Sequence, residues 1–308
     1  MRFGANLPLA AFGDHEFSAR ELAAYAARAE ELGFAVLAAN DHLVFTRPWL
    51  DCLTSLAAVV TSTQAIKLMT TIALPVVRGP VQLAKALTTL GTLSDGRVVA
   101  GVGPGSHRGD YEAAGVDFEE RWPRFDEAVR ALRHLLGADP DPWSGRFYQT
   151  ANIDLEPKPK AQARIPIWVG SWGSDIGLKR VAQLADGWLA SAYNTDPQKF
   201  ADGRRRLDEL VISSGRNVEP FPNAIATMFF HITDSRGEAD RVTRLVAAFL
   251  NRDEEVIREH LLIGSWEDSA AKVAAFRNAG AQTMLVWPVE DELEQLEQFR
   301  VRIMDAVV

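Results

Sequence analysis

The sequence predicts an α/β fold, a closed (β/α)8 barrel in which parallel strands alternate with helices. Short apolar runs alternate with segments of helical periodicity along all 308 residues, which is typical of a parallel sheet. The strand-like runs are almost continuously apolar, as expected when both faces of a sheet are covered. About eight such units without a linker or a change in composition favour one closed barrel domain over 1–308 rather than an open sheet.

The first four units follow from local patterns. Ser18 is a candidate N-cap and Gly33 a stop for the first helix, the second helix can start at Asp51, and Pro80 suits a first helical turn. The strands are expected over 1–7, 34–40, 66–74 and 97–103, and the helices over 18–33, 51–63, 80–94 and 121–137.

The last four units are less regular. Strands are expected over 165–171, 186–191, 223–233 and 282–289, and helical segments over 175–185, 197–215, 237–278 and 291–307. The stretch 137–165 is the main insertion, since it is too long for a plain loop. We expect it to carry short strands of its own or to lie over the site. Together with the helical region near 237–278, it would shape the substrate pocket.

Composition narrows the class of protein. A net charge of −8 and a pI near 5.4 argue against a nucleic-acid surface. The single cysteine, Cys52, favours a reducing compartment, and neither a signal peptide nor an apolar run of ~18 residues is apparent. We therefore expect a soluble cytoplasmic protein without membrane or nucleic-acid partners. Apolar helix faces such as "LAKALTTLGTL" favour a homodimer.

Residues 96–111, "GRVVAGVGPGSHRGDY", form a glycine-rich turn after the fourth strand. Gly101, Gly103 and Gly105 have the spacing G-x-G-x-G, with Pro104 inside it, whereas a dinucleotide-binding turn needs G-x-G-x-x-G near the first strand. In a barrel these glycines would let a ligand approach the backbone at the strand end, where active sites lie. A glycine-rich turn without a ligand is the alternative.

Polar residues follow the second strand, as Asn40, Asp41 and His42. A histidine beside an aspartate at the barrel mouth is suited to proton exchange, although His42 could also face water and Asp41 could be a turn residue. These two residues and His231 could converge in a metal-dependent hydrolase, but no H-x-H or H-E-x-x-H pattern supports this. We expect no metal and a structural role for His231. Trp168, Trp172, Trp188 and Trp287 are expected to pack in or near strands, with lining of an aromatic cofactor as the alternative.

Several segments in order resemble the bacterial luciferase-like superfamily, namely "ELGFAVLAANDHL", "LSDGRVVAGVGPGSHRGDYEAAGVDFEERWPRFDEAVRALRHLL" and "FYQTANIDLEPKPKAQARIPIWVGSWGS" with "LADGWLAS". Members are flavin- or deazaflavin-dependent oxidoreductases with a TIM-barrel fold. The chain is most similar to the branch that uses coenzyme F420, a deazaflavin. The resemblance implies hydride transfer between F420 and a small organic substrate.

The same resemblance implies roles for individual residues. Asp41 would contact the cofactor, and His42 would lie beside the reactive ring as acid/base. A non-prolyl cis peptide at Thr71–Ile72 would support the back of the ring. Further cofactor contacts are implied for Leu74, Pro104 and Gly105, and contacts to the cofactor phosphate for Gly173, Ser174, Ile176 and Gly177.

Two serines would lie near the substrate, Ser191 and Ser106. Ser106 stands where the sugar-phosphate dehydrogenases of this branch have a glutamate proton donor, and a serine is a poor acid, which argues against sugar-phosphate oxidation. Two alternatives to the F420 enzyme stay open from the sequence: an FMN-dependent monooxygenase and a non-catalytic flavin-binding barrel.

Overall fold

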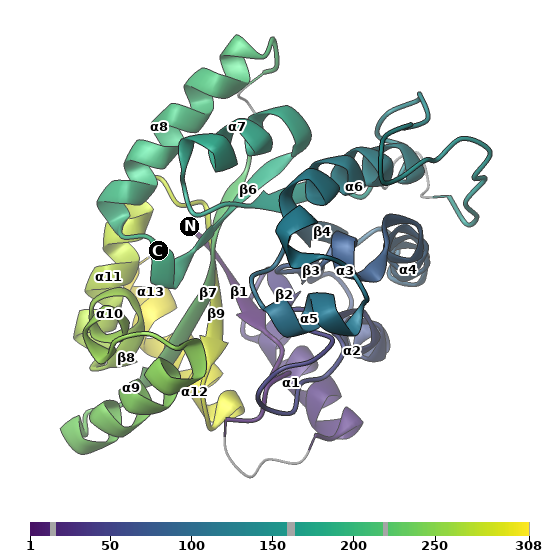
Figure 1. Ribbon diagram of the computed structural model, residues 1–308. Coiled ribbons are helices and arrows are strands. Elements are labelled where there is room, and N and C mark those ends of the chain that lie inside the picture. The colour runs from purple at the N-terminus through teal and green to yellow at the C-terminus, as the bar shows by residue number, and fades with distance from the viewer. Residues whose placement is uncertain (13–16, 159–163, 218–220, 308) are drawn as a thin grey trace.

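The computed structural model describes residues 1–12, 17–158, 164–217 and 221–307. Its centre is a closed barrel of parallel strands (Figure 1). The strands of the barrel are β1 (Arg2–Asn6), β2 (Val36–Ala39), β3 (Lys67–Thr70), β4 (Val98–Val102), β5 (Ile167–Gly170), β6 (Gly187–Ser191), β7 (Asn223–Ile232) and β9 (Thr283–Pro288). Successive strands pair in order from β1 to β7, and β9 pairs with both β7 and β1. The predicted fold class is therefore confirmed.

A ninth strand, β8 (Leu262–Gly264), lies outside this closure, and the sequence did not predict it. It pairs with the second half of β7, while the first half of β7 pairs with β6. A register shift between Ile225 and Met228, with Thr227 at a φ of 60°, separates the two halves. The expected helical region 237–278 is instead α9 (Arg236–Leu250), α10 (Glu254–His260), β8 and α11 (Trp266–Asn278). Three strand residues between helices are too few to show a periodicity.

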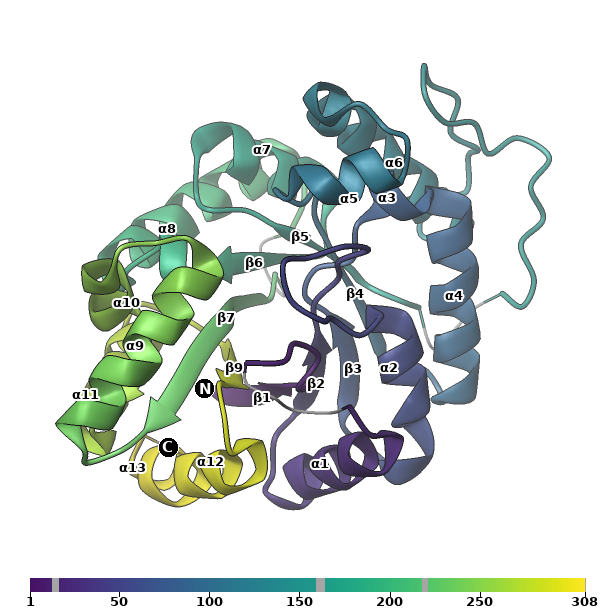
Figure 2. The same ribbon diagram turned by 60° about the horizontal axis from the view of Figure 1, so that its bottom comes forward.

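The helices form a ring around the strands (Figure 2). Asp51 caps its helix by accepting a hydrogen bond from the Thr54 N–H, whereas Ser18 occupies the N-cap position without a side-chain cap bond. Pro80 begins its helix, as predicted. The ring comprises α1 (Ala19–Glu31), α2 (Cys52–Ala58), α4 (Pro80–Leu93), α6 (Arg121–Leu135), α7 (Asp175–Leu184), α8 (Pro197–Ser213), α11 and α12 (Glu292–Phe299), and shorter helices are α3 (Pro75–Arg78), α5 (Arg108–Ala113) and α13 (Asp305–Val307).

Two apolar layers hold the barrel together. The larger one lies between strands and helices, and it includes Leu37 of β2 and Leu87 of α4, both fully buried. The smaller one fills the barrel itself with inward-facing side chains from alternate strand positions: Ala38, Met69, Trp168, Leu189, Ala224, Ala226 and Leu285. The barrel is therefore a packed core, and in this fold a site is expected at the loops that follow the C-terminal ends of the strands.

The insertion after α6 does not lie over that end. Its described part contains one isolated antiparallel bridge, Ser144 to Gln149, and runs along α6 at the side of the molecule (Figures 1 and 2). Glu127 of α6 accepts hydrogen bonds from the backbone of Arg146 and Phe147. Residues 159–163 lie outside the described residues. This segment joins the end of α6 to the start of β5, so it begins and ends at the N-terminal side of the barrel, opposite the expected site. The prediction that it covers the site is therefore wrong for the described part.

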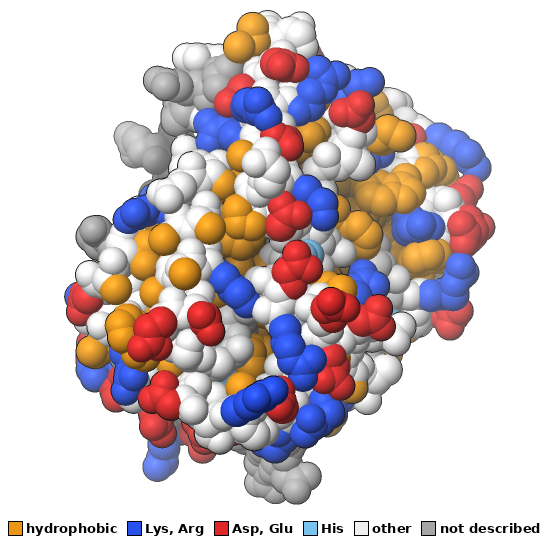
Figure 3. All heavy atoms as spheres, turned by 90° about the vertical axis from the view of Figure 1, so that its left-hand side faces the viewer, with side chains coloured by type: hydrophobic (Ala, Val, Ile, Leu, Met, Phe, Trp, Pro, Cys, Tyr) orange, Lys and Arg blue, Asp and Glu red, His pale blue; other side chains and the backbone are white. Residues whose placement is uncertain are grey.

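The surface seen in Figure 3, which includes α8 and α11, carries acidic and basic side chains interspersed. Among the described residues, no helix is long and apolar enough to cross a membrane. The predicted homodimer stays a prediction, as does the absence of nucleic-acid partners.

Candidate active site at the C-terminal ends of β2 to β5

His42 lies just after β2 and is held by a carboxylate that the sequence did not single out. Its Nδ1 is 2.8 Å from Oδ2 of Asp110, a residue of α5 that is 1% exposed. The other carboxylate oxygen, Oδ1, accepts hydrogen bonds from the backbone N–H groups of Leu43 (2.8 Å) and Val44 (3.0 Å). The loop after β2 and the helix after β4 are therefore joined through one buried side chain.

The environment of Asp110 favours its charged form. Burial alone would raise the pKa of this carboxyl, but hydrogen bonds from His42 and from the backbone of Val44 and Leu43 outweigh it, so the pKa is lowered. An ionised carboxylate only accepts hydrogen bonds. A hydrogen bond between the two groups would therefore be donated by His42 Nδ1.

Aromatic rings surround the rest of His42. Its ring centroid is 4.6 Å from those of both Phe45 and Trp49 and 5.8 Å from that of His107. Phe45 packs against Phe249 of α9, and Trp49 packs against Trp287 of β9. These two rings belong to a larger aromatic cluster that also contains Phe12 and Phe229 of β7. His42 keeps a side-chain exposure of 21%. One side of the imidazole is thus accessible from the mouth, within an apolar wall.

Asp41, by contrast, is 3% exposed and already has partners. Arg78 of α3 binds both of its carboxylate oxygens, and the Leu74 N–H donates to Oδ2 at 3.1 Å. Arg78 also pairs with Asp51. In this arrangement Asp41 fixes the backbone at Leu74, and its predicted contact with a cofactor stays a prediction.

The peptide bond between Thr71 and Ile72 is cis, as the resemblance implies. The glycines of β4 make room for the residues on either side of this peptide bond. A Cβ on Gly103 would lie 2.1 Å from Cδ1 of Ile72, and one on Gly101 would lie 2.1 Å from the Thr70 carbonyl oxygen. Gly101 and Gly103 therefore leave space for Thr70 and Ile72 at the end of β3. From the sequence we expected that space to admit a ligand, and at these two positions protein atoms occupy it.

Gly105 and Pro104 complete this contact. Gly105 has a φ of 76°, and a Cβ there would lie 2.8 Å from Cδ2 of Leu74. Pro104 is buried, and its carbonyl accepts a hydrogen bond from the Tyr111 hydroxyl. The predicted set Ile72, Leu74, Pro104 and Gly105 is thus brought together in space.

A polar network links the ends of the first three strands. Asn40 Oδ1 accepts hydrogen bonds from Asn6 Nδ2 and from the Thr71 hydroxyl, both at 3.0 Å. Asn6 is fully buried, and its Oδ1 has no partner among the described residues. The network sets the position of Thr71 at the start of the cis peptide.

The start of α7 follows β5, two strands along the barrel from β3. Ser174 is the N-cap and accepts a hydrogen bond from the Gly177 N–H at 3.2 Å, and Gly173 has a φ of 89°. Ile176 is 71% exposed. The first N–H groups of a helix lack intrahelical partners, so this exposed turn offers donors and a positive dipole end to an anion.

The two predicted substrate residues lie at different strand ends. Ser106 is exposed between β4 and α5. Ser191, at the end of β6, is half-buried and accepts a hydrogen bond from Asn194 Nδ2 at 3.0 Å.

The convergence considered for a metal hydrolase is wrong. His231 is buried with Nε2 3.1 Å from Glu238, a residue of α9, while Asp41 and His42 have the separate partners described above. The structure instead brings His42, His107 and Asp110 together, with one donor atom of each within 4.8 Å of the others. Two imidazoles and a carboxylate are also a set that suits a divalent cation. The sequence showed no such spacing, because His42 comes from a different strand end.

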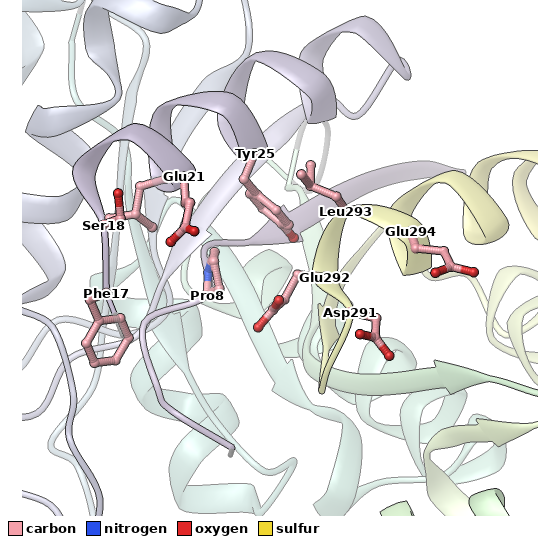
Figure 4. A pocket seen from close by; sticks show the side chains of 10 residues that line it. Pro8, Phe17, Ser18, Glu21, Tyr25, Asp291, Glu292, Leu293 and Glu294 are labelled. Atoms are coloured by element: carbon pink, nitrogen blue, oxygen red, sulfur yellow. The ribbon is translucent and has the colours of Figure 1, made fainter. Parts of the chain in front are cut away.

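A separate hollow of about 290 Å³ lies between α1 and α12 (Figure 4). Its lining includes Tyr25 and four acidic side chains: Glu21, Asp291, Glu292 and Glu294. Such a lining disfavours an anionic ligand, since like charges repel. The predicted phosphate contacts at the start of α7, whose first turn also carries the exposed Asp175, stay a prediction.

Comparison with known proteins agrees with this architecture. Residues 1–252 match the family described as luciferase-like monooxygenase. The chain belongs to that family. A relative of this luciferase-like chain is the F420-dependent glucose-6-phosphate dehydrogenase of Amycolatopsis mediterranei, 28% identical over 58% of this chain and 55% of the relative. The chain thus spans about half of that enzyme.

Two solved structures cover the whole luciferase-like chain. An F420-dependent secondary alcohol dehydrogenase in complex with an F420-acetone adduct superposes with a TM-score of 0.85 at 18% identity, covering 100% of this chain and 99% of that one. The oxygenating constituent of 3,6-diketocamphane monooxygenase from Pseudomonas putida, in complex with FMN, gives 0.73 at 16%, with the same coverage. These likenesses show the shared fold.

Proposed function

We propose that this chain is an oxidoreductase that transfers a hydride between coenzyme F420 and a small organic substrate. The observation that carries the proposal is the position of His42. It is partly exposed at the barrel mouth and oriented by Asp110, and it follows the strand next to the one that ends in the cis peptide Thr71–Ile72. Relatives that are named as F420-dependent dehydrogenases support the choice of cofactor.

The residues present fit an elongated anionic cofactor. The turn of Gly173, Ser174, Ile176 and Gly177 would hold its phosphate, since it is exposed and presents helix N-terminal N–H groups. A Cβ on Gly177 would lie 2.3 Å from Ser171 Oγ, so a larger residue there would displace that hydroxyl. Ile72 and Gly105, which are partly exposed, would support the ring system from the side of β3 and β4, with the buried Leu74 and Pro104 behind them.

When bound, F420 supplies the hydride-accepting or hydride-donating carbon. The chain supplies orientation and the proton. His42, as acid or base, would take the proton of an alcohol or return it to a carbonyl oxygen, and Asp110 would keep the imidazole in position. Phe45 and Trp49 exclude water from one side of that imidazole.

The site favours a neutral substrate over a sugar phosphate. The surroundings of His42 are aromatic, and Ser106 cannot serve as the acid that a glutamate would be at that place. Secondary alcohols, ketones and activated alkenes are therefore the classes to test first.

Fluorescence titration of the purified protein with F420 and, separately, with FMN tests the proposal. Binding of F420, followed by its reduction by propan-2-ol or cyclohexanol, or oxidation of the reduced form by cyclohexenone, is the expected result. Binding of FMN without F420 would favour the second candidate, an FMN-dependent monooxygenase, to which the likeness to an FMN complex points. Tight binding without turnover with any acceptor would favour a non-catalytic flavin-binding barrel.

A further inference from the structure

We propose that Asp110 is a positioning residue that holds His42 in a single tautomer, with the proton on Nδ1 and a free lone pair on Nε2. The inference rests on the proposed function only for its catalytic consequence. The tautomer itself is a property of the protein alone.

The geometry leaves Asp110 little freedom. Oδ1 accepts from two backbone N–H groups, those of Leu43 and Val44, and Oδ2 faces His42 Nδ1 at 2.8 Å. With the side chain 1% exposed, water does not compete for these bonds. The carboxylate can therefore neither rotate away nor exchange its two oxygens without losing several hydrogen bonds.

A second imidazole lies at the same carboxylate oxygen without displacing His42. His107 Nδ1 is 3.7 Å from Asp110 Oδ2, beyond hydrogen-bond distance, and has no partner within the described part of the chain. Among the described histidines, only His42 lies within hydrogen-bond distance of Oδ2. Nε2, on the opposite side of the ring from Nδ1, is then the nitrogen that is free to exchange a proton with a substrate.

The substitution Asp110→Asn tests this with little change in shape. The two backbone donors orient the new amide, since its oxygen satisfies Leu43 and Val44 whereas its NH₂ would not. The amide nitrogen then faces His42 Nδ1 as a donor and requires the opposite tautomer, with the proton on Nε2. The substitution therefore keeps the hydrogen bonds to the backbone of Leu43 and Val44 and moves the imidazole proton of His42 from Nδ1 to Nε2.

The measurement is two-dimensional NMR of ¹⁵N-histidine-labelled full-length protein, treated with EDTA and recorded without cofactor at a pH where His42 is neutral, with His42→Gln to assign the signal. We expect a protonated Nδ1 and bare Nε2 in the wild type and the reverse in Asp110→Asn. Asp117→Asn, an exposed cap beside α5, is the matched control and should keep the wild-type pattern. A protonated Nε2 in the wild type would overturn the proposal, and this reading stands even if the variant fails to fold.

The catalytic consequence is measured with F420 and the substrate found by the panel above. Turnover of Asp110→Asn should fall about 100-fold or more, with F420 affinity and the substrate KM within a few-fold of wild type. Wild-type turnover alongside a reversed tautomer would remove the positioning role. The expected tautomers without F420 binding would instead contradict the proposed function and leave the Asp110–His42 relationship intact.

Discussion

Arg78 binds both carboxylate oxygens of Asp41, although the two residues follow different strands of the barrel. Arg78 also pairs with Asp51, and burial, which alone would lower its pKa, is outweighed by these two carboxylates, so the pKa is raised. The ion pair thus connects the ends of β2 and β3 at the point where the cis peptide begins.

The substitution Arg78→Met should therefore destabilise the fold. It leaves the carboxylate of Asp41 buried without its cation, which costs about 3–5 kcal/mol in comparable buried pairs. Urea denaturation at neutral pH measures the loss. Arg206→Met, which removes exposed pairs with Glu209 and Asp175, is the control and should cost under about 1 kcal/mol. Equal losses for the two variants would contradict the role assigned to Arg78.

The glycines of β4 predict an order of stability. Gly103→Ala meets the end of the Ile72 side chain, which can move, and should cost about 1–3 kcal/mol. In Gly101→Ala the new methyl group meets the Thr70 carbonyl oxygen, which is backbone and cannot move aside. This substitution should therefore lower the free energy of unfolding by more than Gly103→Ala does. Thermal and urea denaturation measure the stability of the two variants. A larger loss for Gly103→Ala than for Gly101→Ala would contradict the close contact between Gly101 and the Thr70 carbonyl. Because Ile72 is a proposed ring contact, Gly103→Ala should also weaken F420 binding.

A negative charge at the start of α7 should weaken cofactor binding without harming the fold. Ile176→Glu places a carboxylate in an exposed first turn, where it favours the helix dipole but repels a phosphate. We expect F420 affinity to fall about tenfold at low salt and to recover partly as salt rises. Ile212→Glu, at an isoleucine of α8 that is 63% exposed, is the control. Unchanged affinity would place the phosphate elsewhere.

Removal of the His42 imidazole should affect chemistry and not binding. His42→Gln is expected to lower turnover about 100-fold or more, the usual contribution of general acid–base catalysis, with F420 affinity within a few-fold. His134→Gln, on the helix α6, serves as the control. If His42→Gln turned over at the wild-type rate, the proton would have to come from another group.

Acid stability should depend on Glu30. Its carboxylate accepts hydrogen bonds from the backbone N–H groups of Gln64, Ala65 and Ile66. Burial tends to raise its pKa, but these bonds outweigh it and the pKa is lowered. Its stabilising effect is therefore complete above about pH 4.3, the ordinary value for Glu, and is lost as the pH falls through the lowered value. Urea denaturation over a pH series should show a weaker acid dependence in Glu30→Gln.

The eight strands of the barrel were predictable, because their apolar runs are long enough to show a pattern, whereas the three residues of β8 are not. The placement of polar residues such as His42 at strand ends was predictable too, since parallel strands in a barrel end on one face. The partners of those residues were not. Arg78 and Asp110 are 37 and 68 positions from the residues they bind. The helix that carries Asp110 has only six residues, too few for a helical period.

The ten-residue strand β7 contributes to two structures in succession. Its first half closes the cylinder against β6, and its second half pairs with β8. The helix that follows β7, α9, places the ring of Phe249 against Phe45 at the mouth. Closure does not use β8, because β7 and β9 pair directly. We therefore expect that exchanging residues 233–265 for those of a relative would change which substrates can enter at the C-terminal end of the barrel, while the barrel strands keep their pairing. This segment is the place to redesign substrate selectivity.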